Sequence, residues 1–325
     1  MKFCFISQCP KMSKGSYRIW VNDLNFYLNQ LGHISCINPK NVDDYDILII
    51  GKSAFRQVQI YRSKYPQKKI LAINPPCSKE NSHQYYNGCI VGSPEEKDSL
   101  LKFYKKILII PLIEKLYKNE KPKKHIEKNE IVIGYHGHPS HLNHMKTGCK
   151  SALEKIAKER SIKLKIFIDE QTVMRWGWIR KSMPNIHIEF IPWNIKTIAK
   201  EILLVDIGIV PSISQFNNCI AKENTTLGEF GTDYIIRFKN KTNAGRCFVF
   251  WELGIPVIAD MTPQVMHMLG DPNNGYPVCS KEGWYYAFKE LLSFKRRQFI
   301  SENALKEYKI KYNPIFWIKQ FIDTI

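Results

Sequence analysis

Short apolar segments alternate with helical segments along nearly the whole chain, and this alternation restricts the fold more than any other feature. In the first part, strands are predicted at residues 2–7, 46–51, 69–74, 89–92 and 107–112. The helices predicted between them cover residues 16–32, 54–65 and 94–104. A chain that alternates strands and helices forms a parallel sheet with helices on both faces. We therefore expect a doubly wound α/β domain here.

The alternation stops at the polar, charge-rich residues 115–129 and then restarts. Strands are predicted at residues 131–137, 164–169, 186–191, 206–212 and 256–260. The helices expected with them cover residues 145–159, 195–204, 247–253, 281–292 and 296–308. We predict an N-terminal domain (1–114), a linker (115–129), a C-terminal domain (130–310) and an amphipathic helix (311–325). Both domains would be Rossmann-like and face a cleft, where ligands of such sheets bind, with the last helix crossing back to the N-terminal domain.

The charge balance favours negatively charged partners. Lys and Arg number 48 against 30 Asp and Glu, which gives a net charge of +18 and a sequence pI near 9.4. Nucleic acid, anionic lipid surfaces and phosphorylated small molecules all fit such a balance. The basic residues are spread along the chain, and no tract resembles a nucleic-acid-binding arm. We therefore expect no nucleic-acid partner.

The apolar runs are too short for a membrane span or a signal peptide. A span needs about 18–20 apolar residues, and the apolar part of the first residues is shorter than a signal peptide requires. Nine cysteines are scattered without a C-x-x-C pair. This favours reduced thiols over disulfides or structural zinc. We predict a cytoplasmic protein that can lie on the inner face of the cell membrane.

The stretch KNKTNAGRCFVFWELGIPVIAD (239–260) predicts an anion site. Its apolar residues 247–253 indicate a largely buried helix, and Gly254 is suited to end it. Four side chains gather near the N–H groups at the start of this helix: Lys239, Lys241, Asn243 and Arg246. A helix N-terminus attracts anions, and nearby cations strengthen that attraction. Cations are themselves unfavourable at this end of a helix, so a solvated helix end is the alternative interpretation.

Several other motifs are absent or have a simpler explanation. Neither half carries G-x-G-x-x-G, and no Walker sequence G-x-x-x-x-G-K-[ST] occurs, which disfavours dinucleotide and ATPase functions. An Asp-x-Asp at 44–46 precedes a predicted strand, where a turn favours Asp. Basic residues and tryptophans are interleaved at 174–181 (MRWGWIRK), and an amphipathic helix is favoured there over a single-strand-binding segment.

Three stretches, in the right order, resemble the GT-B glycosyltransferases. SKGSYRIWVNDLNFYLNQLGH (13–33) is similar to the opening helix of these enzymes. IPWNIKTIAKEILLVDIGIVPS (191–212) is similar to their helix and the strand that ends in Pro-Ser, and NAGRCFVFWELGIPVIAD (243–260) to their donor-site helix and strand. The chain is most similar to the glycosyltransferase family 4-like group, which builds bacterial surface polysaccharides. The resemblance covers nearly the whole chain.

This resemblance implies a nucleotide-sugar in the C-terminal domain and a glycan or lipid-linked acceptor against the N-terminal domain, with no metal or cofactor required. Arg246 and Lys241 would be catalytic. The donor-binding candidates are Gly137, His138, Lys146, Ser212, Lys239, Asn243 and Glu252. The acceptor-side candidates are Lys14, Ser16, Arg18 and His83. An anionic membrane surface is a further expected partner.

The stretch GYHGHPSHLNHMK (134–146) follows the first strand of the C-terminal domain. Its histidines are His136, His138, His141 and His144. They lack the spacings of zinc enzymes and an accompanying carboxylate, so we favour a phosphate or sugar loop over a metal site. Gly137 would let the backbone approach the ligand, and His138 or Lys146 would supply the cation that the resemblance implies. A polar turn with surface histidines is the alternative.

The chain also departs from the family pattern. The paired glutamates of the family would fall on Lys241 and Val249, and Glu252 lies too late in the helix to replace the second one. The ribose contact and the stereochemical outcome therefore stay open. Two alternative functions are a nucleotide-sugar epimerase of the same fold and a non-catalytic polyanion-binding protein.

Overall fold

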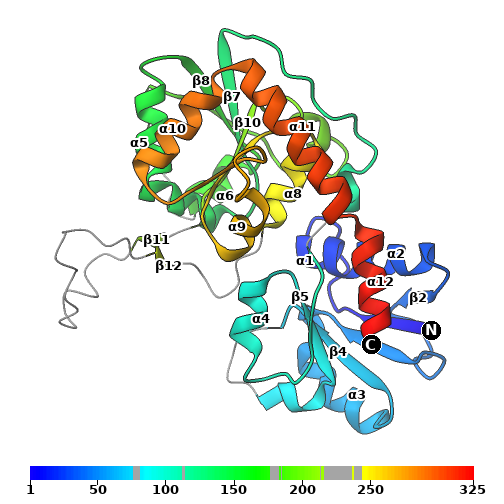
Figure 1. Cartoon of the computed structure of the whole chain (residues 1–325). Helices are drawn as coiled ribbons and strands as arrows, with labels where there is room; N and C mark the ends of the chain where they lie inside the picture. The colour runs from blue at the N-terminus through cyan, green and yellow to red at the C-terminus, as the bar shows by residue number, and fades with distance from the viewer. Residues whose placement is uncertain are drawn as a thin grey trace, which may run out of the picture.

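The structure, a computed structural model, describes residues 1–75, 81–111, 114–175, 183, 185–212, 214–215, 236–237 and 244–325. Two lobes are visible, each built on a six-stranded sheet with helices around it (Figure 1). All strand pairs within these two sheets are parallel. The predicted fold class is therefore confirmed, whereas the domain boundaries at 114, 129 and 310 remain predictions.

The sheet of the N-terminal lobe has the strand order β2-β1-β3-β4-β5-β6. Its strands are β1 (Lys2–Ile6), β2 (Ile34–Ile37), β3 (Ile47–Ile50), β4 (Lys69–Ile73), β5 (Gly88–Val91) and β6 (Ile107–Ile109). The helices and helical turns are α1 (Gly15–Tyr17), η1 (Arg18–Asp23), α2 (Leu24–Gln30), η2 (Lys52–Gln57), α3 (Val58–Lys64), η3 (Asn81–Tyr85) and α4 (Pro94–Leu100). The helix predicted at 16–32 is interrupted by the π-helical turn η1. Strand β2 was not predicted, because its residues are exposed or half-buried and form no apolar run.

The sheet of the C-terminal lobe has the order β14-β13-β10-β7-β8-β9. Its strands are β7 (Glu130–Tyr135), β8 (Ser161–Ile166), β9 (His187–Phe190), β10 (Ile207–Val210), β13 (Val257–Asp260) and β14 (Tyr276–Val278). The helices and turns are η4 (Lys115–Tyr117), η5 (Pro139–Thr147), α5 (Cys149–Ile156), α6 (Glu170–Arg175), α7 (Ile198–Ile202), α8 (Gly245–Glu252), α9 (Pro263–Leu269), α10 (Lys281–Leu291) and α11 (Phe294–Lys311). The last helix of the chain is α12 (Pro314–Thr324). A short antiparallel pair joins β11 (Ser214–Gln215) to β12 (Ile236–Arg237). This strand order changes direction between β7 and β10, and ligands of doubly wound sheets bind at such a point.

Helix α8 forms as its sequence predicts. Five consecutive side chains of this helix are buried: Cys247, Phe248, Val249, Phe250 and Trp251. Gly254 follows the helix with φ of +68°, the left-handed conformation that glycine adopts without steric cost. Strand β13 begins three residues later and pairs with β10. Helix α8 is therefore connected through β13 to the sheet that contains β10.

The last helix crosses back to the N-terminal lobe, as predicted. Helix α12 lies beside α2 in Figure 1. Its residues Ile318 and Phe321 are 2% exposed and belong to the same apolar core as Phe3 and Leu28. Burying two large apolar side chains contributes roughly 3–6 kcal/mol of transfer free energy. The C-terminus therefore fastens one lobe to the other.

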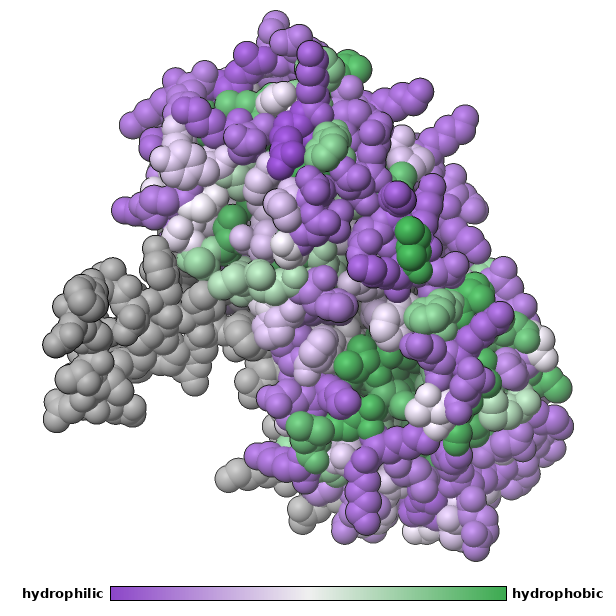
Figure 2. All heavy atoms as spheres, viewed as in Figure 1, coloured by the Kyte–Doolittle hydropathy of each residue, from purple (hydrophilic) through white to green (hydrophobic). Residues whose placement is uncertain are grey.

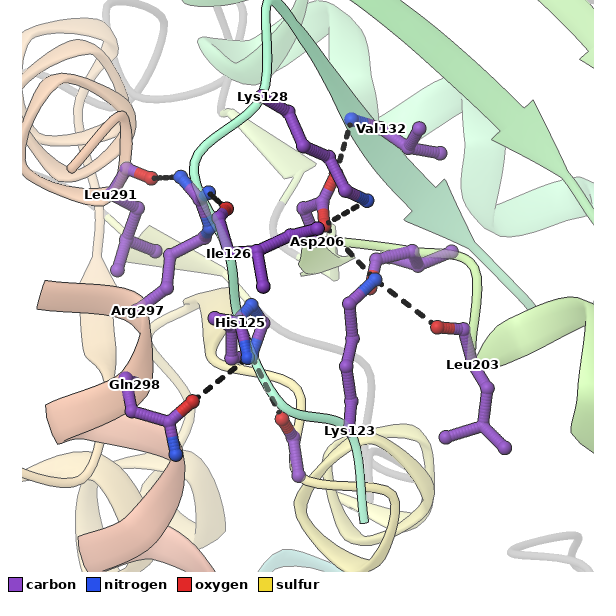
Figure 3. Close-up of polar contacts among 12 residues, drawn as sticks. Lys123, His125, Ile126, Lys128, Val132, Leu203, Asp206, Leu291, Arg297 and Gln298 are labelled. Carbon is purple, nitrogen blue, oxygen red and sulfur yellow. Dashed lines mark hydrogen bonds and ion pairs between the residues drawn. The ribbon is translucent and has the colours of Figure 1, made fainter. Parts of the chain in front are cut away.

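The predicted linker is bound to the C-terminal lobe by a buried polar group, which we call the Asp206 cluster: Lys123, His125, Lys128, Asp206 and Arg297 (Figure 3). Asp206 Oδ1 lies 2.9 Å from Lys123 Nζ and 3.0 Å from Lys128 Nζ. His125 Nε2 lies 3.0 Å from the carbonyl oxygen of Gly254. Arg297 is fully buried and donates from Nη1 to two carbonyl oxygens at the end of α10 and the residue after it. Residues 123–128 are thus part of the C-terminal lobe's packing.

Three further findings concern the described ranges only. None of their helices combines the length and apolar character needed to cross a membrane. The cysteines within them are free thiols. Among the same residues, no group of three or more His, Cys, Asp or Glu side chains is placed to hold a metal ion.

Candidate active site

A cleft of about 700 Å³ lies between the two lobes. The N-terminal lobe contributes the turn after β1 and the start of η1. The C-terminal lobe contributes the loops after β7, β8 and β9 and the first turn of α8. The loop after β7 and the end of β10 meet at the point where the strand order changes direction, so the cleft lies where a parallel sheet of this kind binds ligands.

Arg246, the second residue of α8, lines this cleft. Its Nη2 donates to Ser212 Oγ at 2.8 Å and to the carbonyl oxygen of Pro211 at 3.1 Å. The guanidinium carbon lies 5.7 Å from the centre of the Tyr135 ring. Nη1 is buried and has no hydrogen-bond partner within the described part of the chain. A buried guanidinium N–H without a partner is costly, so the site is suited to an added anion.

Ser212 is itself held in place by the strand next to it. Its backbone N–H donates to Asp260 Oδ2 at 2.6 Å, and Asp260 Oδ1 accepts from Trp284 Nε1 at 3.0 Å. Asp260 is 2% exposed and ends β13. Because this carboxylate fixes Ser212, it also fixes the hydroxyl that orients Arg246.

Gly137 and His136, in the loop after β7, lie directly against Arg246. Gly137 has φ of +133°, and a Cβ added there would lie 2.7 Å from Arg246 Cδ. His136 Nε2 lies 3.2 Å from the carbonyl oxygen of Arg246. Burial lowers the pKa of His136 to about 3, so the ring is neutral at pH 7 and adds no charge beside the guanidinium. The loop after β7 therefore leaves room for Arg246 that any larger residue at 137 would fill.

His138 lines the cleft and starts η5. Its Nδ1 accepts from the backbone N–H of Ser140 at 3.3 Å, and its carbonyl oxygen accepts from Tyr135 Oη at 2.7 Å. Lys146, near the end of η5, is exposed and is not among the residues that line the cleft. Of the two cations proposed for this loop, the structure brings only His138 to the cleft.

On the N-terminal side, Lys14, Ser16 and Arg18 line the cleft. Arg18 is held by three donated hydrogen bonds, from Nε and Nη2 to Glu114 Oε2 at 3.1 and 2.7 Å and from Nη1 to the carbonyl oxygen of Met12 at 2.9 Å. Its guanidinium also lies 4.7 Å from the ring centre of Trp193, which belongs to the other lobe. Arg18 thus connects the two lobes in addition to lining the cleft.

Two predicted residues do not join Arg246. Glu252 lies at the other end of α8 and lines a separate pocket of about 450 Å³, between α2 and α11. Six residues of α-helix span about 9 Å, so one helix cannot place both side chains at one phosphate. Burial raises the pKa of Glu252 to about 7. His83 packs its ring 5.1 Å from that of Phe103 and does not line the cleft.

The remaining predicted residues, Lys239, Lys241 and Asn243, lie outside the described residues. Sequence reasoning missed other residues that line the cleft: Glu114, Tyr117, Phe167, Ile168, Asp169, Pro192 and Trp193. Those at 167–169 and 192–193 follow the ends of β8 and β9. The rule that parallel sheets bind ligands beyond the carboxyl ends of their strands would have indicated them.

No family model matches this chain, and no curated protein matches it. Among solved structures, a glycosyltransferase from Rickettsia africae is 16% identical, with a TM-score of 0.63 over 99% of this chain and 97% of the other. WaaG, a glycosyltransferase involved in lipopolysaccharide biosynthesis, is 11% identical, with a TM-score of 0.59 over 99% of both chains. A variant of S. aureus TarM in complex with UDP and α-GlcNAc-glycerol is 13% identical, with a TM-score of 0.59 over 92% of this chain.

This chain spans only 57% of the TarM chain. A putative UDP-N-acetylglucosamine 2-epimerase from Listeria monocytogenes also matches, with 11% identity and a TM-score of 0.50 over 99% of this chain and 94% of the other. Identities this low concern the fold alone. The two parallel sheets, the interlobe cleft and these likenesses together show that the chain has the GT-B fold.

Proposed function

We propose that this protein is a glycosyltransferase that moves a sugar from a nucleotide-sugar to a glycan or lipid-linked acceptor of a bacterial surface polysaccharide. One observation carries the proposal. Arg246 lies at the N-terminus of α8 on the wall of the interlobe cleft, with Nη1 buried and lacking a partner among the described residues. A guanidinium beside a helix N-terminus suits a diphosphate.

The chemistry follows from that placement. Transfer breaks the bond between the anomeric carbon and the phosphate oxygen, so negative charge grows on the leaving diphosphate while the sugar becomes oxocarbenium-like. Arg246 and the start of α8 would stabilise this charge more in the transition state than in the ground state. Because the chain supplies positive charge here, we propose that the reaction requires no metal or organic cofactor.

The acceptor would lie against Lys14 and Ser16, on the N-terminal wall of the cleft. A lipid-linked acceptor would bring this lobe to a membrane surface. An apolar patch on the N-terminal lobe, between α4 and α12 in Figure 2, and a net charge of +18 support that position on an anionic membrane. The assignment to the family 4-like group and the cytoplasmic location belong to the same proposal.

An epimerase is the second candidate, because the Listeria epimerase shares the fold. Both functions use a nucleotide-sugar, but an epimerase needs no acceptor. Incubation with the nucleotide-sugar alone separates them. NMR would show inversion at one sugar carbon for an epimerase, whereas a transferase would leave the sugar unchanged or release it slowly to water.

The first test is a thermal-shift panel with UDP, GDP, CMP, ADP and a short DNA duplex at low and moderate salt. A ligand at ~100 times its dissociation constant adds ~2.7 kcal/mol of stability, which raises the midpoint by several degrees. We expect one nucleotide to give such a shift. A salt-sensitive shift with DNA and none with nucleotides would instead support a polyanion-binding protein.

Arg296→Met is a matched control for Arg246→Met. Both arginines lie in the first turn of a helix of the C-terminal lobe, and both donate to a hydroxyl and a proline carbonyl. Arg296 does not line the cleft. We expect Arg246→Met to lose the nucleotide-induced shift and Arg296→Met to keep it. Equal shifts in both variants would exclude Arg246 as the phosphate ligand.

A further inference from the structure

The two lobes meet at a second place, away from Arg18. Helix α4 of the N-terminal lobe contacts α9 of the C-terminal lobe, and Figure 1 shows α9 directly above α4. The backbone N–H of Gln264, in the first turn of α9, donates to Glu95 Oε1 at 3.1 Å. Its side-chain Nε2 donates to the carbonyl oxygen of Gly92 at 3.0 Å. Two hydrogen bonds from one residue therefore cross the interface between the lobes.

The same side chain also holds the helix that carries Arg246. Gln264 Oε1 accepts from the backbone N–H of Ala244 at 2.6 Å. Ala244 is the N-cap of α8, two residues before Arg246, and its own side chain forms no cap. The hydrogen bond to Gln264 therefore holds the backbone at the residue that precedes α8.

Because these residues are buried, losing any of these hydrogen bonds is costly. Gln264 is 4% exposed, Glu95 is 6% exposed and Ala244 is fully buried. A buried polar group that loses its partner costs more than a typical hydrogen bond contributes. An amide has both an acceptor oxygen and a donor NH₂, so glutamine can serve Ala244 and Gly92 at once. A carboxylate keeps only the acceptor, and an apolar side chain of similar length keeps neither.

We propose that Gln264 is a positioning residue that couples contact between the lobes to the N-terminus of the helix carrying Arg246. When α4 and α9 are in contact, Gln264 is held by Gly92 and Glu95, and its amide oxygen fixes Ala244. When the lobes separate, Gln264 loses both partners in the N-terminal lobe. The backbone of Ala244 at the start of α8 is then held less tightly. That this helix then receives a diphosphate rests on the proposed function, but the coupling itself does not.

Hydrogen–deuterium exchange at the Ala244 amide tests the coupling without any assay of activity. Glu95→Ala removes a partner in the other lobe and does not alter α8 itself. We expect exchange at Ala244 to become about tenfold faster, as for loss of one hydrogen bond of ordinary strength. Asp98→Ala, on the exposed face of the same helix, is the control and leaves exchange unchanged. An unchanged rate in Glu95→Ala would overturn the proposal.

Kinetics of Gln264 variants give a second readout. Gln264→Glu keeps the acceptor for Ala244 but cannot donate to Gly92, and its charge repels Glu95. We expect its kcat to fall about tenfold while the nucleotide Kd changes by less than about twofold, because α8 stays anchored. Gln264→Met should weaken nucleotide binding as well. Equal behaviour of the two variants would contradict separate roles for oxygen and nitrogen. Wild-type protein that transfers no sugar would refute the proposed function and leave the exchange result to decide the coupling.

Discussion

The Asp206 cluster and the cleft bury positive charge in opposite ways. In the cluster, one carboxylate accepts from Lys123 and Lys128 at 2.9 and 3.0 Å. Burial raises the pKa of Asp206, but Lys123, the N–H of Val132 and Lys128 together outweigh burial and hold that pKa below its ordinary value. In the cleft, no Asp or Glu of the described ranges pairs with Arg246, whose Nη2 contacts only neutral oxygens.

The two regions differ in whether a described carboxylate pairs with their cations. The Asp206 cluster contains its own anion and binds residues 123–128 to the C-terminal lobe, so its charges serve stability. Around Arg246, the described residues supply a cation, a hydroxyl and a helix end but no carboxylate that pairs with it, which is consistent with the proposed anionic ligand. Cations of similar chemistry in the two regions thus differ in whether a described carboxylate lies beside them, and we propose that this difference separates a stabilising role from ligand binding.

Removing that carboxylate should have the largest effect. Asp206→Asn leaves Lys123 buried without a negative partner, and breaking a buried ion pair in this way costs about 3–5 kcal/mol. We expect the free energy of unfolding to fall by that amount in urea denaturation at pH 7. Glu189→Gln is the control, because Glu189 is 37% exposed and Lys165, the buried one of its two lysine partners, also pairs with Glu201. It should change stability by less than about 1 kcal/mol. Similar losses of stability in the two variants would show that the Asp206 carboxylate is no more important for stability than the half-exposed Glu189.

The cleft should respond in the reverse manner. Arg246→Met removes no ion pair among the described residues, but Ser212 Oγ and the Pro211 carbonyl lose this donor, so we expect the free energy of unfolding to fall by about 1–3 kcal/mol. Transition-state stabilisation should fall by about 2–4 kcal/mol, a loss of roughly 30- to 10³-fold in kcat/KM, as for removal of a key electrostatic donor. Urea denaturation and kinetics on one preparation measure both. A stability loss as large as that of Asp206→Asn would mean that Arg246 is structural.

The fold was predictable because its strands are nearly all buried apolar runs that alternate with helices. Strand β3, for example, is four buried residues, Ile47–Ile50. Two elements lack this signal. Strand β14 is only three residues long and mostly half-buried, and the sequence pattern predicts no helix at the position of α9. Packing against the rest of the fold stabilises these elements, and a single sequence carries little signal for such long-range contacts.

The candidate site was predictable where it follows directly from strand ends and helix starts, as for Gly137, Ser212 and Arg246. It was not predictable where distant segments meet. Trp193 reaches Arg18 across the cleft, and Gln264 reaches Gly92 between lobes. Neither pair is marked by spacing in the sequence. Glu252 is close to Arg246 in sequence, but it lies at the other end of α8 and lines a separate pocket.

Low pH should lower the stability of the folded chain through one buried, neutral histidine in each region. Burial lowers the pKa of His125, in the cluster, to about 4 and that of His136, beside Arg246, to about 3. Below pH ~6.5 the unfolded chain binds protons on these rings and the folded chain does not. These two rings therefore lower the free energy of unfolding as pH falls from about 6.5 to 4, by at most ~1.4 kcal/mol per pH unit for each ring. Glu252 acts in the opposite direction, because burial raises its pKa to about 7 and the folded chain takes up its proton first. Urea denaturation across this range measures the slope.

His125→Gln isolates the contribution of the cluster. It should lower the slope by about one proton. Because the ordinary pKa of Asp206 lies below this window, its titration adds little between pH 4 and 6.5. A slope that is the same in His125→Gln and the wild type would show that this ring is protonated in the folded state.

The smallest expected effect comes from a single methyl group at Gly137. Gly137→Ala places a Cβ 2.7 Å from Arg246 Cδ, at φ of +133°, so Arg246 must move and the backbone is strained. We expect stability to fall by about 1–2 kcal/mol and nucleotide affinity to fall about tenfold. Gly32→Ala is the control, because its φ of +83° imposes backbone strain while a Cβ there meets nothing within 4 Å. Gly137→Ala that loses stability as Gly32→Ala does but binds nucleotide like the wild type would show that ligand binding does not need the position of Arg246 that Gly137 leaves open, and would exclude this guanidinium as the ligand site.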